Sequence, residues 1–243
     1  GSRISAVPEL SAFADGKVYL VYMSDNPGSG REIRFNRSTD FGGTWQVSDT
    51  VLVTLAHPSG YFEFYDWPGT TLAALSDGSV YVAWSDGSNV FLARSTDAGA
   101  HFLTADVDQD GRGFNRYPRI CAASSLLVLT WLSPNLSVTN QSIWGVSSGD
   151  KGATWSVTKQ LRTEGVASGV DLHALACDAS GHAVAVWPDG RGGGLVLYSS
   201  RFGGSSWSGD VVVSGPAGVS LLPDVGFVDA THAVVVYGDQ AST

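Results

Sequence analysis

One short pattern occurs five times along this chain and limits its fold more than any other feature of the sequence. Each copy has a small turn, then a strand of alternating apolar residues, then an aromatic residue. The aromatic residue stands six positions after the second turn residue in every copy, and these aromatics are Tyr22, Trp84, Trp131, Trp187 and Tyr237. A turn followed by strand residues of period two predicts a β-hairpin. The sequence therefore predicts five copies of one β-unit.

A second motif follows each of the first four hairpins. Its pattern is Ser-x-Asp-x-Gly-x-Thr-Trp, and it occupies residues 38–45, 95–102, 148–155 and 200–207. The first and third copies match fully, the second matches in part, and Phe202 replaces the aspartate in the fourth. In such a turn the carboxylate accepts nearby backbone N–H groups and glycine takes a positive φ. We expect Trp45 and Trp155 to be largely buried beneath their turns.

The two motifs together resemble those of the Asp-box (BNR-repeat) proteins, whose best-known members are sialidases. The resemblance covers nearly the whole chain, and the aspartate position recurs after 57, 53 and 52 residues. In that family the boxes join the third and fourth strands of each blade of a β-propeller. The resemblance implies an all-β propeller of four-stranded antiparallel blades. We place four complete units near 8–53, 68–106, 118–161 and 170–213, and a partial fifth at 219–243, in a single domain.

The partial fifth unit leaves the closure of the propeller open. Only two strands are expected before the sequence stops at Thr243. An open edge and an unpaired apolar face are costly, so a propeller needs a closed last blade. Residues 3–7 are one source of a closing strand, residues downstream are a second, and self-association or another chain is a third.

Composition and charge exclude several classes of protein. Hydrophobic residues make up 43% and charged residues 15%, which is enough apolar material for a full core and excludes general disorder. The apolar runs are too short to span a membrane. The net charge is −9 with no basic run, so nucleic acid is not an expected partner. The sequence starts at Gly1 rather than methionine, which indicates a processed or replaced N-terminus, and we expect a secreted or cell-surface protein.

The cysteines and histidines give no sign of a reactive site. Cys121 and Cys177 each stand ten residues before the aromatic of their unit, which is a core-facing position, and we expect two buried free thiols. The five histidines are scattered without ligand spacing, so zinc and Ser-His-Asp chemistry are not expected.

One acidic loop is a candidate metal site. Asp106, Asp108 and Asp110 alternate and are followed by Gly111, a pattern whose oxygens can surround a hard cation. Calcium is the only cofactor that the sequence suggests, and we expect that no cofactor is required. The alternative is a solvated acidic connector.

An aromatic connector at residues 61–67 separates the first two units. It includes Tyr65 and Trp67 beside Glu63 and Asp66. Aromatic faces can stack on the C–H surface of a sugar while carboxylates accept its hydroxyls. An extra strand or a hydrophobic plug is the equally weighted alternative.

The resemblance also implies candidate site residues. Sialidases hold the substrate carboxylate with three arginines and use a Tyr–Glu nucleophile pair and an aspartate acid/base. Arg3 resembles the first arginine because it begins an Arg-Ile-Ser sequence where the family has Arg-Ile-Pro. Asp25 stands where the acid/base falls, and Arg191 resembles the second arginine. Arg119 is a further candidate for the central channel.

Two departures from the family pattern decide the expected function. Residues 169–180, where the family has its glutamate, contain none, and Tyr237 is the only late tyrosine. We therefore expect a lectin-like propeller that binds a carbohydrate or glycoconjugate without cleaving it. Its expected ligand-binding residues are Arg3, Arg119, Arg191, Tyr65 and Trp67, with Asp25 catalytic only in an enzyme. A sialidase-type glycoside hydrolase and a protein-interaction propeller are the alternatives.

Overall fold

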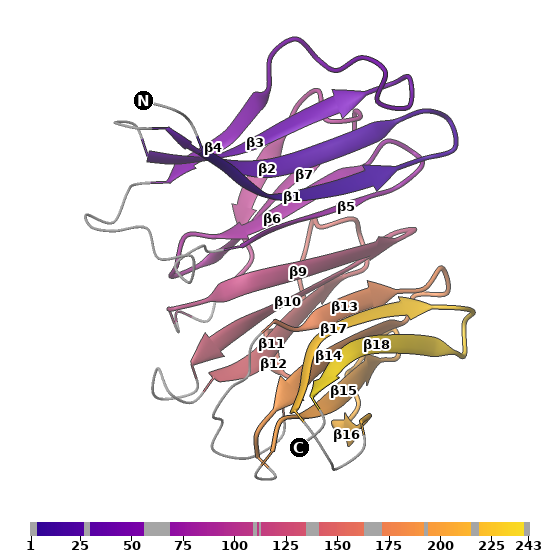
Figure 1. Ribbon diagram of the computed structural model, residues 1–243. Coiled ribbons are helices and arrows are strands. Elements are labelled where there is room, and N and C mark those ends of the chain that lie inside the picture. Colours follow the sequence, from indigo (N-terminus) through magenta and orange to yellow (C-terminus); the bar gives the residue numbers. More distant parts are fainter. Residues whose placement is uncertain are drawn as a thin grey trace.

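The computed structural model describes residues 4–26, 30–55, 69–108, 111, 113–134, 141–162, 172–191, 194–214 and 219–240. Every regular element in these ranges is a β-strand (Figure 1). Within the same ranges no helix is long and apolar enough to cross a membrane.

Four sheets each contain four consecutive antiparallel strands, and we call them blades 1 to 4. Blade 1 contains β1 (Ile4–Ala12), β2 (Val18–Asn26), β3 (Gly30–Ser38) and β4 (Thr50–Leu55). Blade 2 contains β5 (Thr70–Ala74), β6 (Val80–Ser85), β7 (Val90–Ser95) and β8 (Leu103–Asp106). Blade 3 contains β9 (Arg116–Ala123), β10 (Leu126–Pro134), β11 (Gln141–Ser148) and β12 (Lys159–Gln160). Blade 4 contains β13 (Ala174–Cys177), β14 (Ala183–Asp189), β15 (Val196–Phe202) and β16 (Val211–Val212).

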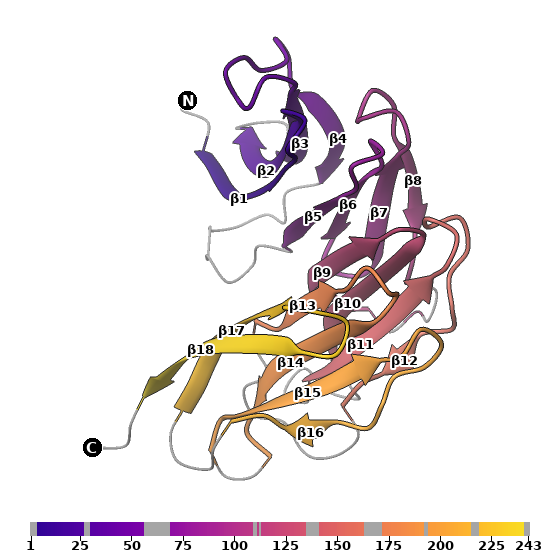
Figure 2. The ribbon, with the colours of Figure 1, turned by 90° about the vertical axis from the view of Figure 1, so that its right-hand side faces the viewer.

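The fifth unit, blade 5, is a two-stranded hairpin of β17 (Val219–Phe227) and β18 (Ala233–Gln240). The prediction of an all-β fold with four complete units and a partial fifth is thus confirmed. The first strands of successive blades contact one another, in the pairs β1 with β5, β5 with β9, β9 with β13 and β13 with β17. The blades follow one another in an arc with these first strands along its inner side (Figures 1 and 2).

The N-terminal residues do not close the last blade. Residues Ile4 to Ala6 form the start of β1 and pair with Asp25, Ser24 and Met23 of β2. The expectation that they add a strand to the fifth unit is therefore wrong. Apolar residues of β18 remain exposed, among them Val234 and Val236. Closure by downstream residues or by another chain stays a prediction.

The core lies between neighbouring blades. The aromatic residues at the repeated hairpin position in blades 2, 3 and 4, Trp84, Trp131 and Trp187, are fully buried. In the end units, Tyr22 is half-buried and Tyr237 is exposed. A residue of the same type and position is thus buried only where a blade packs on each side of it.

The turns of the second motif are built alike in blades 1, 2 and 3. In blade 1, Ser38 Oγ donates to the Asp40 carboxylate at 2.7 Å and accepts from the Gly42 N–H at 3.0 Å, and the Thr44 N–H donates to Asp40 at 2.7 Å. The same contacts recur around Asp97 and Asp150. The Thr44 hydroxyl also donates to Asp40, at 2.7 Å, and this hydrogen bond, with those from Ser38 and the Thr44 N–H, holds the pKa of Asp40 down to about 2.

The aromatic residues of these turns are less buried than expected. Trp155 is half-buried against the core shared by blades 2 and 3, whereas Trp45 is 38% exposed. The prediction that both are largely buried is wrong for Trp45, whereas Trp155 is partly buried. The reason is that each turn aromatic packs on the preceding blade, as Phe102 does on Phe35 with ring centroids 5.0 Å apart. Blade 1 has no preceding blade among the described residues.

The two cysteines form a disulfide, so the prediction of free thiols is wrong. Cys121 lies within β9 and Cys177 is the last residue of β13, with their Cα atoms 5.6 Å apart. Similar positions on the first strands of neighbouring blades lie side by side, and this places the two sulfurs within bonding reach.

Candidate functional site

One position on the first strand recurs in all five blades and faces the inner side of the arc. In each blade it pairs with the residue immediately before the repeated aromatic position. The paired residues are Glu9 with Val21, Thr71 with Ala83, Arg119 with Thr130, Ala174 with Val186, and Asp224 with Val236. We call Glu9, Thr71, Arg119, Ala174 and Asp224 the axial ring.

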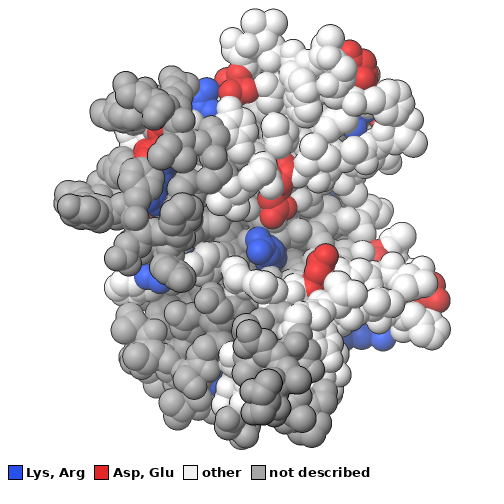
Figure 3. Space-filling model, in the orientation of Figure 1, with Lys and Arg blue, Asp and Glu red and all other residues white. Residues whose placement is uncertain are grey.

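The axial ring surrounds a cavity of about 380 Å³. All five ring residues line it, and so do residues next to them in the chain, including Leu172, His173 and Leu222. Figure 3 shows a hollow in the middle of this face, with a basic side chain between acidic ones. Every blade therefore contributes to a single cavity.

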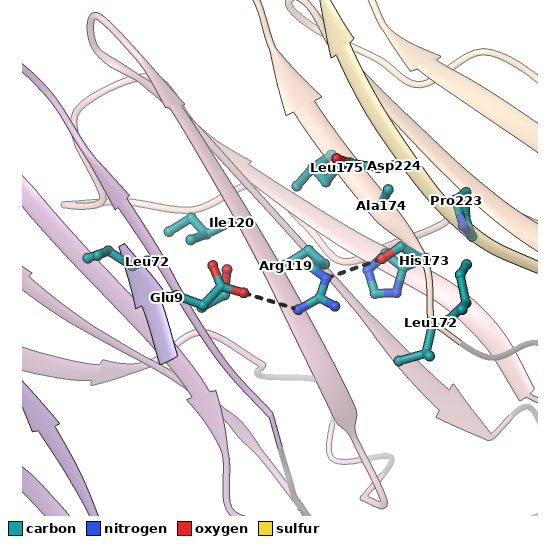
Figure 4. A pocket seen from close by; sticks show the side chains of 12 residues that line it. Glu9, Leu72, Arg119, Ile120, Leu172, His173, Ala174, Leu175, Pro223 and Asp224 are labelled. Atoms are coloured by element: carbon teal, nitrogen blue, oxygen red, sulfur yellow. Dashed lines mark hydrogen bonds and ion pairs between the residues drawn. The ribbon is translucent and has the colours of Figure 1, made fainter. Parts of the chain in front are cut away.

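Arg119 connects three blades across this cavity. Its Nε donates to the backbone carbonyl of His173 at 3.2 Å, and its Nη1 lies 3.7 Å from a carboxylate oxygen of Glu9 (Figure 4). Both side chains remain about a third exposed. Burial raises the pKa of Glu9, and the Arg119 charge and a hydrogen bond from the Leu72 backbone offset only part of this shift. The site thus holds one guanidinium beside a carboxyl group whose pKa is raised.

His173 forms a neutral wall of the cavity. Its Nε2 lies 2.8 Å from Thr130 Oγ1, and among the described residues its buried Nδ1 has no hydrogen-bond partner. Burial, together with the charge of Arg119, lowers the pKa of His173 to about 3. The imidazole is therefore uncharged at neutral pH.

A backbone irregularity precedes every ring residue by two positions. Val7, Gly69, Tyr117, Leu172 and Leu222 all have a positive φ, between 48° and 76°. The register of β1, β9 and β17 shifts at these points, as expected of β-bulges. A bulge bends its strand and redirects the side chains beside it. The three bulges thus redirect the ring residues of β1, β9 and β17, and in blades 2 and 4 the positive-φ residue lies just before the first strand.

Of the arginines expected in a central pocket, Arg119 lines the cavity and Arg191 does not. Arg191 donates to Asp189 at 2.8 Å, contacts Asp210, and lies over the ring of Tyr198 at 4.0 Å. Asp189 also accepts two hydrogen bonds from Arg162, at 2.6 and 3.0 Å. Arg191 therefore belongs to a charge cluster at the end of β14.

The other expected residues lie elsewhere or outside the described part of the chain. Asp25 is buried near the end of β2, opposite Ile4 and Arg31, and does not line the cavity. Arg3, Tyr65 and Trp67 lie outside the described residues, as does Asp110.

The two described residues of the acidic loop already have polar partners. Asp106 accepts from Asn89 at 2.9 Å, and Asp108 is buried and accepts from Asn115. Burial, the largest cause, raises the pKa of Asp106. No group of three metal-ligating side chains occurs within the described ranges. Calcium binding with Asp110 stays a prediction.

Comparison with protein-family models and with curated protein sequences finds no match. Comparison with solved structures finds similar folds. An α-L-arabinanase from Penicillium chrysogenum, solved with arabinobiose, matches with a TM-score of 0.59 and 16% identity over 97% of this chain and 76% of its own. An α-L-arabinofuranosidase from Fusarium graminearum matches with a TM-score of 0.56 and 14% identity over 97% and 74%.

A sialidase from Streptococcus pneumoniae also matches, with a TM-score of 0.56 and 14% identity over 87% of this chain. This chain spans 33% of the length of that sialidase. At such low identity these likenesses establish the fold, which is a β-propeller.

Proposed function

We propose that this protein is a lectin-like propeller that binds a glycan in the axial cavity without cleaving it. The observation that carries the proposal is the axial ring itself, in which Glu9, Arg119 and Asp224 converge from three blades on one cavity. Carboxylates accept hydrogen bonds from sugar hydroxyls and a guanidinium donates to them, which is the sparse polar lining that a glycan site needs. The similar folds named above supply a second support, because their names are those of enzymes that act on sugars.

The charges of the ring favour an uncharged glycan. Arg119 is the only arginine or lysine that lines the cavity among the described residues, and its Nη1 lies 3.7 Å from Glu9. Asp224 adds a second carboxylate, and the whole chain carries a net charge of −9. A carboxylated sugar such as a sialoside would have to compete with Glu9 for Arg119, and a neutral oligosaccharide would not.

Glycoside hydrolysis is the second candidate, and one observation favours it. Glu9 has a raised pKa and shares the cavity with the exposed carboxylate of Asp224. Glycosidases use two carboxyl groups that flank the glycosidic bond, and the one that acts as the acid has a raised pKa. This reading assigns the acid role to Glu9 instead of Asp25.

A glycan array combined with fluorogenic arabinoside and sialoside substrates tests the proposal. We expect binding of neutral oligosaccharides, weaker binding of sialosides and no turnover. Turnover by the parent that disappears in Glu9→Gln would contradict the lectin proposal and support a glycoside hydrolase. If neither binding nor turnover is detected, the glycan proposal is overturned and a protein-interaction propeller is favoured.

We also propose that the protein is secreted or displayed on the cell surface. The Cys121–Cys177 disulfide supports this because disulfides persist mainly in oxidising compartments. Thiol labelling of the protein taken from its native source provides the test, and the expected result is two cysteines that react only after reduction. Labelling of both cysteines before reduction would contradict it.

A further inference from the structure

Two leucines that line the axial cavity adopt a backbone conformation that leucine rarely takes. Leu172 has a φ of 48° and Leu222 a φ of 51°, each two residues before its ring residue. In this left-handed region the Cβ of any residue except glycine crowds the following carbonyl. The leucines are therefore maintained at an energetic cost.

The fold does not require a leucine at this position. Blade 2 has Gly69 at the equivalent position with a φ of 76°, and a Cβ there would lie 3.1 Å from the Cα of Tyr117. Core packing does not account for Leu222 either, because that residue is 66% exposed. An apolar side chain that is both strained and exposed contributes little to stability.

Strained residues that persist at a cavity point to a role in function. We infer that Leu172 and Leu222 are glycan-contact residues that pack against the C–H face of the bound sugar. The inference rests on the proposed function and deepens it. The axial ring binds the hydroxyl groups, and the two leucines, on neighbouring blades, select sugars that present an apolar face.

The positive φ of these residues provides a way to separate this role from a structural one. Glycine suits a positive φ, so Leu172→Gly and Leu222→Gly remove the apolar contact and relieve the strain together. Val7→Gly is the matched control, because Val7 has a φ of 53° and is 39% exposed at the equivalent position but does not line the cavity. Leu222→Ala removes the contact and keeps the strained backbone.

The experiment measures the melting temperature of each variant and its affinity for arabinobiose, lactose and sialyllactose by calorimetry. We expect melting temperatures at or near that of the parent in all glycine variants. Affinity for the sugar that the parent binds best is expected to fall about tenfold in Leu172→Gly, Leu222→Gly and Leu222→Ala, and to stay unchanged in Val7→Gly.

Two results would overturn the inference, and they are distinguishable. In the first, the leucine variants bind sugar as tightly as the parent does, whether or not their melting temperature falls. This result would show that the leucines do not contact the glycan, and the proposed function would stand. A parent that binds none of these sugars and none on the array would remove the proposed function and this inference together.

Discussion

Two sets of positive-φ residues lie at different places on the blades, and they differ in what surrounds them. The turns of blades 1 to 3 contain Phe41, Ala98 and Lys151, each within the same serine and aspartate hydrogen bonds. The second set precedes the five ring residues, which are of four chemical kinds: acidic, basic, hydroxyl-bearing and apolar. Both sets occupy equivalent positions from blade to blade, but only the turns repeat their chemistry.

This difference separates architecture from function. A repeated fold needs the same hydrogen bonds in every copy, so turn chemistry that recurs is explained by the blade itself. A binding site on the axis of a propeller needs unlike groups around one ligand. Chemistry that varies at an equivalent position is therefore the stronger sign of a ligand site.

Removing the disulfide is expected to have the largest effect on stability. It tests whether the stability of the fold can change without a change in glycan binding at the axial ring. Cys121 and Cys177 are 56 residues apart in sequence, and removing such a cross-link costs about 4 kcal/mol of unfolding free energy in the chain-entropy account. We expect Cys121→Ala/Cys177→Ala to unfold at a markedly lower denaturant concentration and to keep its glycan affinity. Urea titration of the variant against the oxidised parent measures the cost. An unchanged midpoint would show that the disulfide does not stabilise the fold.

Two arginines test the contrast between the axial ring and the turns, because one belongs to the ring and the other contacts a turn. Arg119 belongs to the ring, whereas Arg37 donates to the Ala98 carbonyl in a turn of the next blade at 2.6 Å. We expect Arg119→Ala to lose affinity for the bound sugar by about tenfold to a hundredfold, because a charge-assisted hydrogen bond is lost. Arg37→Ala is expected to lower the melting temperature and leave the affinity unchanged.

Calorimetric titration and thermal melting of both variants provide the measurement. If Arg37→Ala weakened binding as much as Arg119→Ala does, the turns and the ring would not be functionally distinct.

The pH dependence of stability is expected to have opposite signs in the two regions. The depressed pKa of Asp40, about 2, means that its contribution is present above pH 4 and is lost as the pH falls toward 2. The raised pKa of Glu9 means that its carboxyl group favours the folded state when protonated, and this contribution is lost as the pH rises through the folded pKa.

Melting temperatures between pH 2 and pH 7 check both signs. Asp40→Asn should flatten the acid side of the profile, whereas Glu9→Gln should remove a decrease on the neutral side. A Glu9→Gln profile that runs parallel to that of the parent would contradict the assigned shift.

Calcium is expected to have the smallest effect. The acidic loop follows β8 and leads to β9, so a cation there would add stability near the strand starts instead of the turns. If Asp106, Asp108 and Asp110 bind calcium in the native state only, a chelator lowers the melting temperature by a few degrees at most. Equal melting curves in chelator and in millimolar calcium would show that the loop does not bind calcium and is an acidic connector.

The sequence alone predicted the turns well because their chemistry repeats. The fixed offset of six residues and the Ser-x-Asp pattern identified four blades and a hairpin, which the structure confirms. The offset did not reveal the axial ring. The hairpin of blade 3 turns through two residues between Ala123 and Leu126, whereas that of blade 1 uses five between Ala12 and Val18. Arg119 is therefore equivalent to Glu9 by pairing, but not by its distance from the aromatic residue.

The remaining errors have related physical causes. Cys121 and Cys177 occupy similar positions on neighbouring blades and therefore lie next to each other. The prediction of free thiols treated each blade separately and missed this contact. Trp45 needs a preceding blade to bury it, which a local motif does not report. His173 was treated as a scattered histidine, since its contact with Thr130 links residues 43 positions apart.

The most direct test of the central claim is a crystal structure of the protein soaked with the neutral oligosaccharide that it binds best. We predict ordered sugar in the axial cavity, with hydroxyl groups within hydrogen-bond distance of Arg119 and of Glu9 or Asp224, and with Leu222 against its C–H face. Ordered sugar at Tyr65 and Trp67, with the axial cavity free of it, would contradict the account.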